Sequence, residues 1–167
     1  MQSSAMQKGP GQQMKIKAGF VGAVALLAFG TAHATAEENR FVQKQRLSAK
    51  QTAVVAEGDL EARSVGSYSV RVYSTEDVQP GDDTTFFTAG VIHERDGSLE
   101  KIGLADIDGD GRDELVVTIR SAGSGGYLSA HAYSFAKTKI KLTAAVADLS
   151  PKSDPIAQLK LAAKKHK

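Results

Sequence analysis

Residues 104–135, LADIDGDGRDELVVTIRSAGSGGYLSAHAYSF, decide the fold of this chain. They contain two glycine-rich loops, and each loop leads into a run of residues that favours a β-strand. The run 114–119 (ELVVTI) is rich in β-branched residues and predicts a buried strand. Residues 128–135 alternate between apolar and polar side chains, which predicts a second strand after a hairpin loop.

The first loop, residues 106–110, is acidic, and we call it the aspartate loop. Asp106, Asp108 and Asp110 alternate in it, with glycines between and after them. Alternate placement lets several carboxylates converge on one point while the glycines take tight backbone angles, as in D-x-D-x-D-G calcium loops. An EF-hand would carry a glutamate at the twelfth position, where this chain has Val117, and a strand follows the loop. The pattern is therefore that of a strand-flanked calcium loop and excludes an EF-hand.

Two interpretations of the aspartate loop stay open on the sequence. In one, Ca²⁺ is bound by Asp106, Asp108 and Asp110, by the carbonyl of Arg112, and by Asp113 or Glu114. In the other, the loop is a tight turn in which aspartate side chains accept hydrogen bonds from backbone amides of the loop itself. In the first interpretation, the bound ion would brace the turn rather than perform chemistry.

The second loop, residues 121–127 (SAGSGGY), is called the tyrosine loop below. Its small residues give a narrow backbone that can enter a cleft closed to a bulkier loop. Tyr127 adds a large rigid ring and a hydroxyl with few rotatable bonds, which suits a contact anchor. Ser124 lies three residues earlier, so both hydroxyls can point at one target. The alternative interpretation is a plain hairpin connection with an exposed tyrosine.

Two kinds of catalytic or nucleotide site are excluded at the tyrosine loop. A phosphate-binding P-loop needs Gly-Lys-Ser/Thr opening a helix, and here no lysine is present and a strand follows. A nucleophile elbow needs a residue between each glycine and the serine, whereas Gly123, Ser124 and Gly125 are adjacent.

Taken together, residues 105–135 resemble the periplasmic inhibitors of I-type (invertebrate-type) lysozyme, and FFTAGVIHERDGSLEKIGL at 86–104 fits the same family. The resemblance implies an inhibitor that inserts the tyrosine loop into the active-site cleft of the lysozyme. Lysozymes use two carboxyl groups that flank the scissile bond, and hydroxyl groups can donate hydrogen bonds to them. The lysozyme-binding residues implied by the resemblance are Ser124 and Tyr127, with Ser121, Gly123, Gly125 and Gly126 around them.

The N-terminus carries the features of an export signal. From Met14 the chain shows two lysines, an apolar run at 18–30 and Ala-His-Ala at 32–34, which predicts cleavage after Ala34. The mature chain is then one domain, residues 35–167, in the periplasm, with no membrane segment after cleavage. The apolar run is too short for an ordinary membrane span.

The net charge of the chain bears on its partners, and its cysteine content bears on its stability. Removing residues 1–34 takes away three lysines and no acidic residue, so the formal net charge falls from +2 to −1. A nearly neutral body gives no reason to expect nucleic acid as a partner. The chain has no cysteine, so its stability must come from the core.

Turn signals and alternation predict the remaining elements. An Asp96-Gly97 pair between strand-like runs predicts a type I′ hairpin, and Asp154 before Pro155 predicts a capped helix start. We therefore expect a small antiparallel β-sandwich or barrel with a short C-terminal helix. The further strands are expected at 51–57, 67–74, 86–94, 98–104 and 139–146, with a ragged strand or an ordered arm at 35–50.

Three functional hypotheses follow from these features. The first is a non-enzymatic inhibitor that binds I-type lysozyme and requires no cofactor. This hypothesis is compatible with either a monomer or a homodimer. The second is a calcium-binding β module that uses the aspartate loop for adhesion or partner binding. The third is an exported hydrolase, which would need a base beside Ser124; the mature histidines, at 93, 131 and 166, stand in no catalytic motif.

Overall fold

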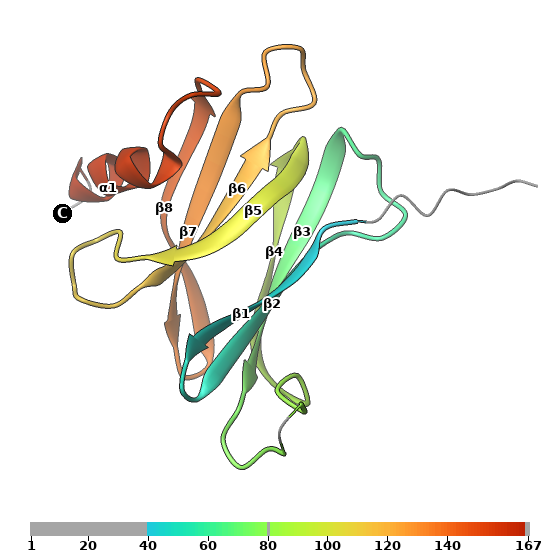
Figure 1. The fold of residues 1–167 in the computed structure, drawn as a ribbon, viewed down its shortest axis with the longest axis vertical. Helices are drawn as coiled ribbons and strands as arrows, with labels where there is room; N and C mark the ends of the chain where they lie inside the picture. Colours follow the sequence, from blue (N-terminus) through green and yellow to red (C-terminus); the bar gives the residue numbers. More distant parts are fainter. Residues whose placement is uncertain (1–39, 80, 166–167) are drawn as a thin grey trace, which may run out of the picture. The chain divides into compact units, whose positions relative to one another are not determined.

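The computed structural model describes residues 40–79 and 81–165, so the predicted signal peptide lies outside the described residues. Eight strands form two four-stranded antiparallel sheets, each with its strands in chain order (Figure 1). The first sheet contains β1 (Val42–Ser48), β2 (Gln51–Glu57), β3 (Val65–Ser74) and β4 (Phe86–Asp96). The second contains β5 (Ser98–Ala105), β6 (Glu114–Arg120), β7 (Leu128–Ala136) and β8 (Lys139–Leu149). The predicted all-β sandwich is confirmed.

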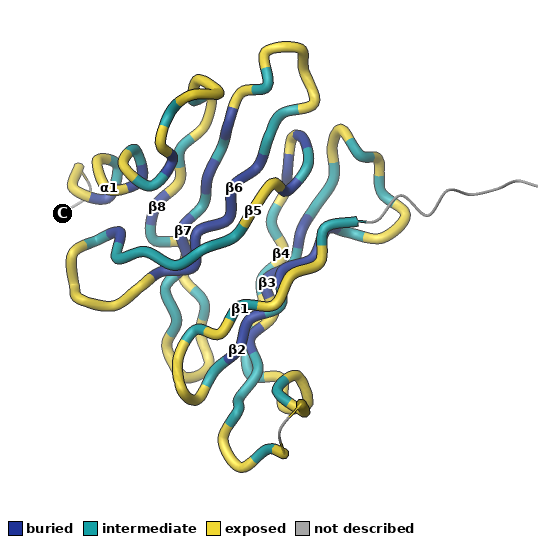
Figure 2. The backbone as a smooth tube through the Cα atoms, in the orientation of Figure 1, coloured by how far each residue is buried: buried dark blue, intermediate teal, exposed yellow. Residues whose placement is uncertain are grey.

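The core lies between the two sheets and is made by alternate residues of the central strands. Val70 of β3 and Val117 of β6 are fully buried there, as their places in the alternating pattern require. Strand β6 is buried on both faces, which explains why apolar and β-branched residues fill most of it without alternating with exposed polar ones. Figure 2 shows this burial as dark blue on β2, β3, β6 and β7, with much of the connecting loops exposed in yellow.

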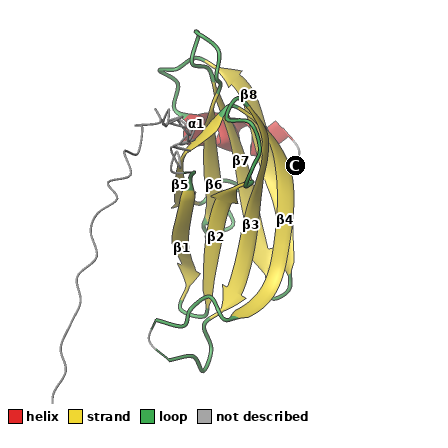
Figure 3. Ribbon diagram, turned by 90° about the vertical axis from the view of Figure 1, so that its right-hand side faces the viewer, coloured by secondary structure: helices red, strands yellow, loops and turns green. Residues whose placement is uncertain are grey.

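A helix, α1 (Pro155–Lys165), covers the outer face of the second sheet. Asp154 begins it as predicted: the amide of Ile156 donates to its carboxylate at 2.9 Å. Leu159 and Ala163 then pack against small residues of β7 and β8. Figure 3 shows the first sheet face on, with β1 to β4 side by side. Within the described residues, no helix is long and apolar enough to cross a membrane.

The predicted hairpin at Asp96-Gly97 is wrong. Asp96 pairs with Val65 in the first sheet, whereas Ser98 pairs with Arg120 in the second. Gly97 lies between them with φ of +110°, and the chain changes sheets at this point. A type I′ turn and a corner of this kind both need positive φ, so the dipeptide alone did not distinguish them.

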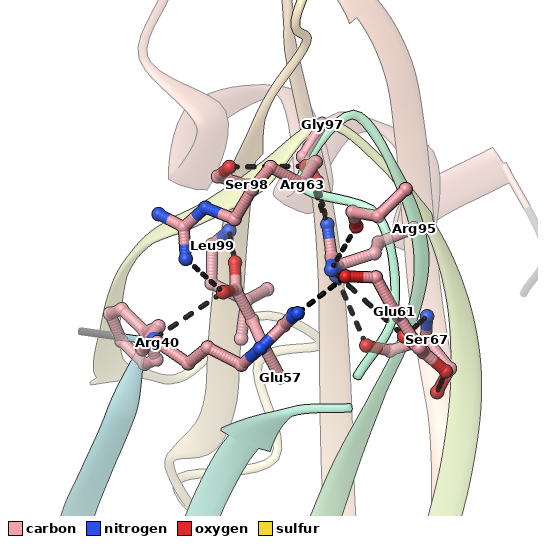
Figure 4. A network of polar contacts seen from close by, with 11 residues as sticks. Arg40, Glu57, Glu61, Arg63, Ser67, Arg95, Gly97, Ser98 and Leu99 are labelled. Atoms are coloured by element: carbon pink, nitrogen blue, oxygen red, sulfur yellow. Dashed lines mark hydrogen bonds and ion pairs between the residues drawn. The ribbon is translucent and has the colours of Figure 1, made fainter. Parts of the chain in front are cut away.

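Buried charged groups tie the two sheets together near that corner (Figure 4). Glu57 of β2 accepts a hydrogen bond from the amide of Leu99 of β5 at 2.8 Å and pairs with Arg63 at 3.3 Å. The side chain of Arg95 is fully buried, and its guanidinium donates to four backbone carbonyls. A buried charge is tolerated only when its donors are satisfied in this way.

Candidate functional site

The tyrosine loop connects β6 to β7 and projects from one end of the second sheet (Figure 1). Two backbone hydrogen bonds close it. The amide of Ser121 donates to the carbonyl of Tyr127 at 2.9 Å, and the amide of Gly126 donates to that of Gly123 at 3.0 Å. Gly126 has φ of +55°, a conformation that favours glycine. The loop is therefore a hairpin connection with a defined backbone.

The two predicted contact residues of this loop face solvent. Tyr127 is 51% exposed, and Ser124 is exposed at the tip. No other described residue hydrogen-bonds to either hydroxyl group. Both groups therefore keep their full hydrogen-bonding capacity for a partner.

Gly125 determines where the tyrosine ring lies. A Cβ atom at this position would overlap the ring of Tyr127, so the ring rests directly against the glycine backbone. Any other residue would push the ring to a different place. The glycines of the loop thus serve two purposes: Gly126 permits its turn, and Gly125 makes room for the anchor.

Sequence reasoning missed one part of the site, which is the pair formed by Arg120 and Glu100. The guanidinium of Arg120 contacts both carboxylate oxygens of Glu100, at 2.8 and 2.9 Å, and donates to the carbonyl of Gly126 at 2.9 Å. Glu100 is 20 residues away in sequence. Only the pairing of β5 with β6 brings the two side chains together.

The aspartate loop lies at the other end of β6, in the connection from β5. Its carboxylates bond to backbone amides of the connection itself: Asp106 accepts from Gly109 and Gly111 at 2.7 and 3.2 Å, and Asp108 accepts from Asp110 at 3.0 Å. This is the arrangement that the tight-turn interpretation predicts.

Buried Glu114 completes that arrangement. Glu114 is 2% exposed, and its carboxylate accepts from the amide of Ile107 at 2.7 Å. Burial raises the pKa of this carboxyl group above its ordinary value. Oxygen atoms of Asp106, Asp108 and Glu114 lie within 4.8 Å of one another. Asp110 and Arg112, which also belong to the predicted calcium set, pair with each other instead: Asp110 accepts from the amide of Arg112 at 2.8 Å and pairs with its guanidinium at 3.4 Å.

Comparison with known proteins identifies the family. The sequence model of the family described as "Periplasmic lysozyme inhibitor of I-type lysozyme" (PliI) matches residues 39–163. This chain belongs to the PliI family. The comparison with curated proteins gives no match.

Two solved PliI structures are similar to this chain. One is PliI-Ah, the periplasmic lysozyme inhibitor of I-type lysozyme from Aeromonas hydrophila, at 38% identity and a TM-score of 0.66. The match covers 71% of this chain and 98% of that one. The other is Aeromonas hydrophila PliI in complex with Meretrix lusoria lysozyme, at 38% identity and a TM-score of 0.64, covering 72% and 95% of the two chains.

This PliI-family chain places its two described histidines in the sandwich rather than at Ser124. The Tyr68 hydroxyl bonds to Nδ1 of His131 and to the Tyr133 hydroxyl, both at 2.6 Å, and the rings of His93 and His131 lie 4.4 Å apart. Burial, followed by the neighbouring His93, lowers the pKa of His131 to about 4. The histidines therefore belong to a polar cluster within the β-sandwich, and neither hydrogen-bonds to Ser124.

Proposed function

We propose that this PliI-family protein inhibits I-type lysozyme by inserting the tyrosine loop into the active-site cleft of the enzyme. One observation carries the proposal: Ser124 and Tyr127 present unshared hydroxyl groups on a thin, glycine-rich projection. Membership of the PliI family supports the proposal, because the family is described as periplasmic inhibitors of this lysozyme type. The related Aeromonas hydrophila protein forms a complex with a lysozyme, which supports a protein partner of the same class.

The chemistry of inhibition would be occlusion. A lysozyme cleaves its substrate with two carboxyl groups on either side of the glycosidic bond. A hydroxyl group that donates to a carboxylate makes a charge-assisted hydrogen bond, which is stronger than a neutral one. Ser124 and Tyr127 would occupy these acceptors while the glycine backbone fills the sugar site. The proposal therefore assigns no catalytic step to this chain.

The direct test is the Tyr127→Ala variant in a lysozyme inhibition assay. Loss of a buried tyrosine anchor is expected to cost about 2 kcal/mol, or ~30-fold in inhibition constant. Ile92→Ala is the matched control, because Ile92 is 74% exposed on the outer face of β4. If Tyr127→Ala inhibits I-type lysozyme as well as the unmodified protein does, the insertion proposal is wrong.

Calcium binding is the second candidate function. It is favoured by the convergence of Asp106, Asp108 and Glu114, whose oxygen atoms are of the type that Ca²⁺ prefers. Titration with CaCl₂ followed by thermal unfolding tests it, with Asp108→Asn as the comparison. A Ca²⁺-dependent rise in melting temperature that Asp108→Asn removes supports the site, and an unchanged melting temperature excludes it.

A further inference from the structure

The tyrosine loop has more conformational freedom to lose than most loops of its length. Three of its seven residues are glycines, at 123, 125 and 126, and glycine loses the most backbone entropy on ordering. Only two backbone hydrogen bonds close the loop from within. A loop that became ordered only on contact would bind more weakly, because the ordering cost would reduce the affinity. The structure shows how the loop is held in advance.

Arg120, which precedes the loop, holds it with a third hydrogen bond, made by its side chain. One terminal nitrogen of its guanidinium donates to the Gly126 carbonyl at 2.9 Å, at the residue with positive φ next to Tyr127. The Nε atom and the other terminal nitrogen contact the two carboxylate oxygens of Glu100. The planar guanidinium can make both contacts at once, which the point charge of a lysine cannot. The bidentate pair with Glu100 therefore fixes the direction in which Arg120 reaches the loop.

A β-bulge aims Glu100 at Arg120. Leu99 pairs with Ile119 and Lys101 pairs with Thr118, so Glu100 is the extra residue of β5 between two paired positions. An extra residue of this kind bends the strand and redirects its side chain. Such irregularities are over-represented next to functional sites.

The base of the loop rests on the sheet-crossing corner. Gly97 lies so close to the Arg120 carbonyl that a Cβ atom would overlap it. Its amide donates to the Ser64 carbonyl at 2.8 Å, and its own carbonyl accepts from the buried guanidinium of Arg95 (Figure 4). Arg95 also donates to the Arg63 carbonyl at 2.9 Å. The corner is thus a fixed support for Arg120, whose contacts with Glu100 and the Gly126 carbonyl we call the clamp.

We infer that Arg120, oriented by Glu100 in the bulge, is a positioning residue that presets the tyrosine loop for lysozyme binding. The inference rests on the proposed function of that loop. Arg120 acts through the Gly126 carbonyl on the backbone that carries Tyr127 and does not need to touch the enzyme. Its loss should slow association, because fewer molecules then hold the binding conformation.

The first measurement is made on the free protein. Amide hydrogen exchange at Ser121 and Gly126 is compared between the unmodified chain, Arg120→Lys and Glu100→Gln. Exchange at both amides should become at least ~10-fold faster in Arg120→Lys and change less in Glu100→Gln, which keeps one acceptor oxygen. Arg71→Lys, on the exposed outer face of β3, is the matched control and should leave exchange and inhibition unchanged. Unchanged exchange in Arg120→Lys overturns the inference, whatever Tyr127→Ala does.

The second measurement is association with I-type lysozyme. Arg120→Lys should reduce the association rate about 10-fold with little change in melting temperature, and should have little further effect when Tyr127→Ala is already present. Equal losses in both backgrounds would mean that Arg120 contacts the enzyme itself, and would overturn the positioning role. Full inhibition by Tyr127→Ala would instead overturn the proposed function, and the exchange result would still report on the clamp.

Discussion

The two glycine-rich loops lie at opposite ends of the same buried strand, and they use similar residues in opposite ways. In the aspartate loop, the carboxylates turn back onto amides of their own connection, and buried Glu114 closes the arrangement. In the tyrosine loop, the backbone closes on itself and the hydroxyls of Ser124 and Tyr127 face outward. Glycine supplies the turn in both cases.

The difference shows that composition alone does not mark a binding loop. What distinguishes the two is where the hydrogen bonds of the polar side chains go. Side chains that satisfy the local backbone stabilise a turn, whereas side chains left to solvent can satisfy a partner. The predictions below test this division, from the largest expected effect to the smallest.

Gly97→Ala should have the largest effect on stability. The position has φ of +110°, and the added Cβ atom would overlap the Arg120 carbonyl at the base of the tyrosine loop. We expect a loss of about 3 kcal/mol or more in the free energy of unfolding, measured by urea denaturation. Gly109→Ala is the matched control in the aspartate loop, with φ of +79° and open space around it. It should cost only about 1 kcal/mol, and equal losses would contradict the close packing at Gly97.

Glu114→Ala should separate stability from inhibition. The change leaves the Ile107 amide without its acceptor in a buried site, so about 2 kcal/mol of unfolding free energy should be lost. Inhibition of lysozyme at a temperature where the variant is folded should be unchanged, because the tyrosine loop is at the other end of β6. A loss of inhibition in the folded variant would make the aspartate loop part of the binding surface.

Acid should weaken the sandwich on which both loops rest. The pKa of His131 is about 4 in the folded chain, where it meets Tyr68, Tyr133 and His93, and near 6.5 in an unfolded one. The unfolded chain therefore binds the proton more readily than the folded chain does. The contribution of neutral His131 to the free energy of unfolding is fully present above pH 6.5 and is lost as the pH falls through 4. The loss should be on the order of 1 to 2 kcal/mol, since partial exposure of the ring screens it. His131→Gln should flatten the pH profile of unfolding between pH 6.5 and 4, and an equal slope would contradict the assignment.

Much of the fold could be predicted from local sequence. Alternation located β3, the concentration of β-branched residues located β6, and Asp154 marked the start of α1, because each pattern reflects the burial or capping of neighbouring residues. The tyrosine loop could be singled out for the same reason, since its small residues and its tyrosine are contiguous. The family resemblance then pointed to Ser124 and Tyr127 as its contact residues.

The rest depended on partners distant in sequence. The corner at Gly97 has the same local signature as a hairpin turn, and only the pairing of Ser98 with Arg120 reveals the change of sheet. The clamp depends on Glu100, whose side chain is oriented by a β-bulge that no sequence pattern in β5 predicts. The sequence left either Asp113 or Glu114 as a further member of the acidic cluster, and the backbone of the turn decides that Glu114 is the one that lies with Asp106 and Asp108.

Hydrogen exchange of the protein with and without I-type lysozyme tests the division between the two loops most directly. We predict that bound lysozyme slows exchange at amides of the tyrosine loop and leaves those of the aspartate loop unchanged. Protection of Gly109 and Gly111, with Ser124 and Tyr127 exchanging as in the free protein, would contradict the central claim.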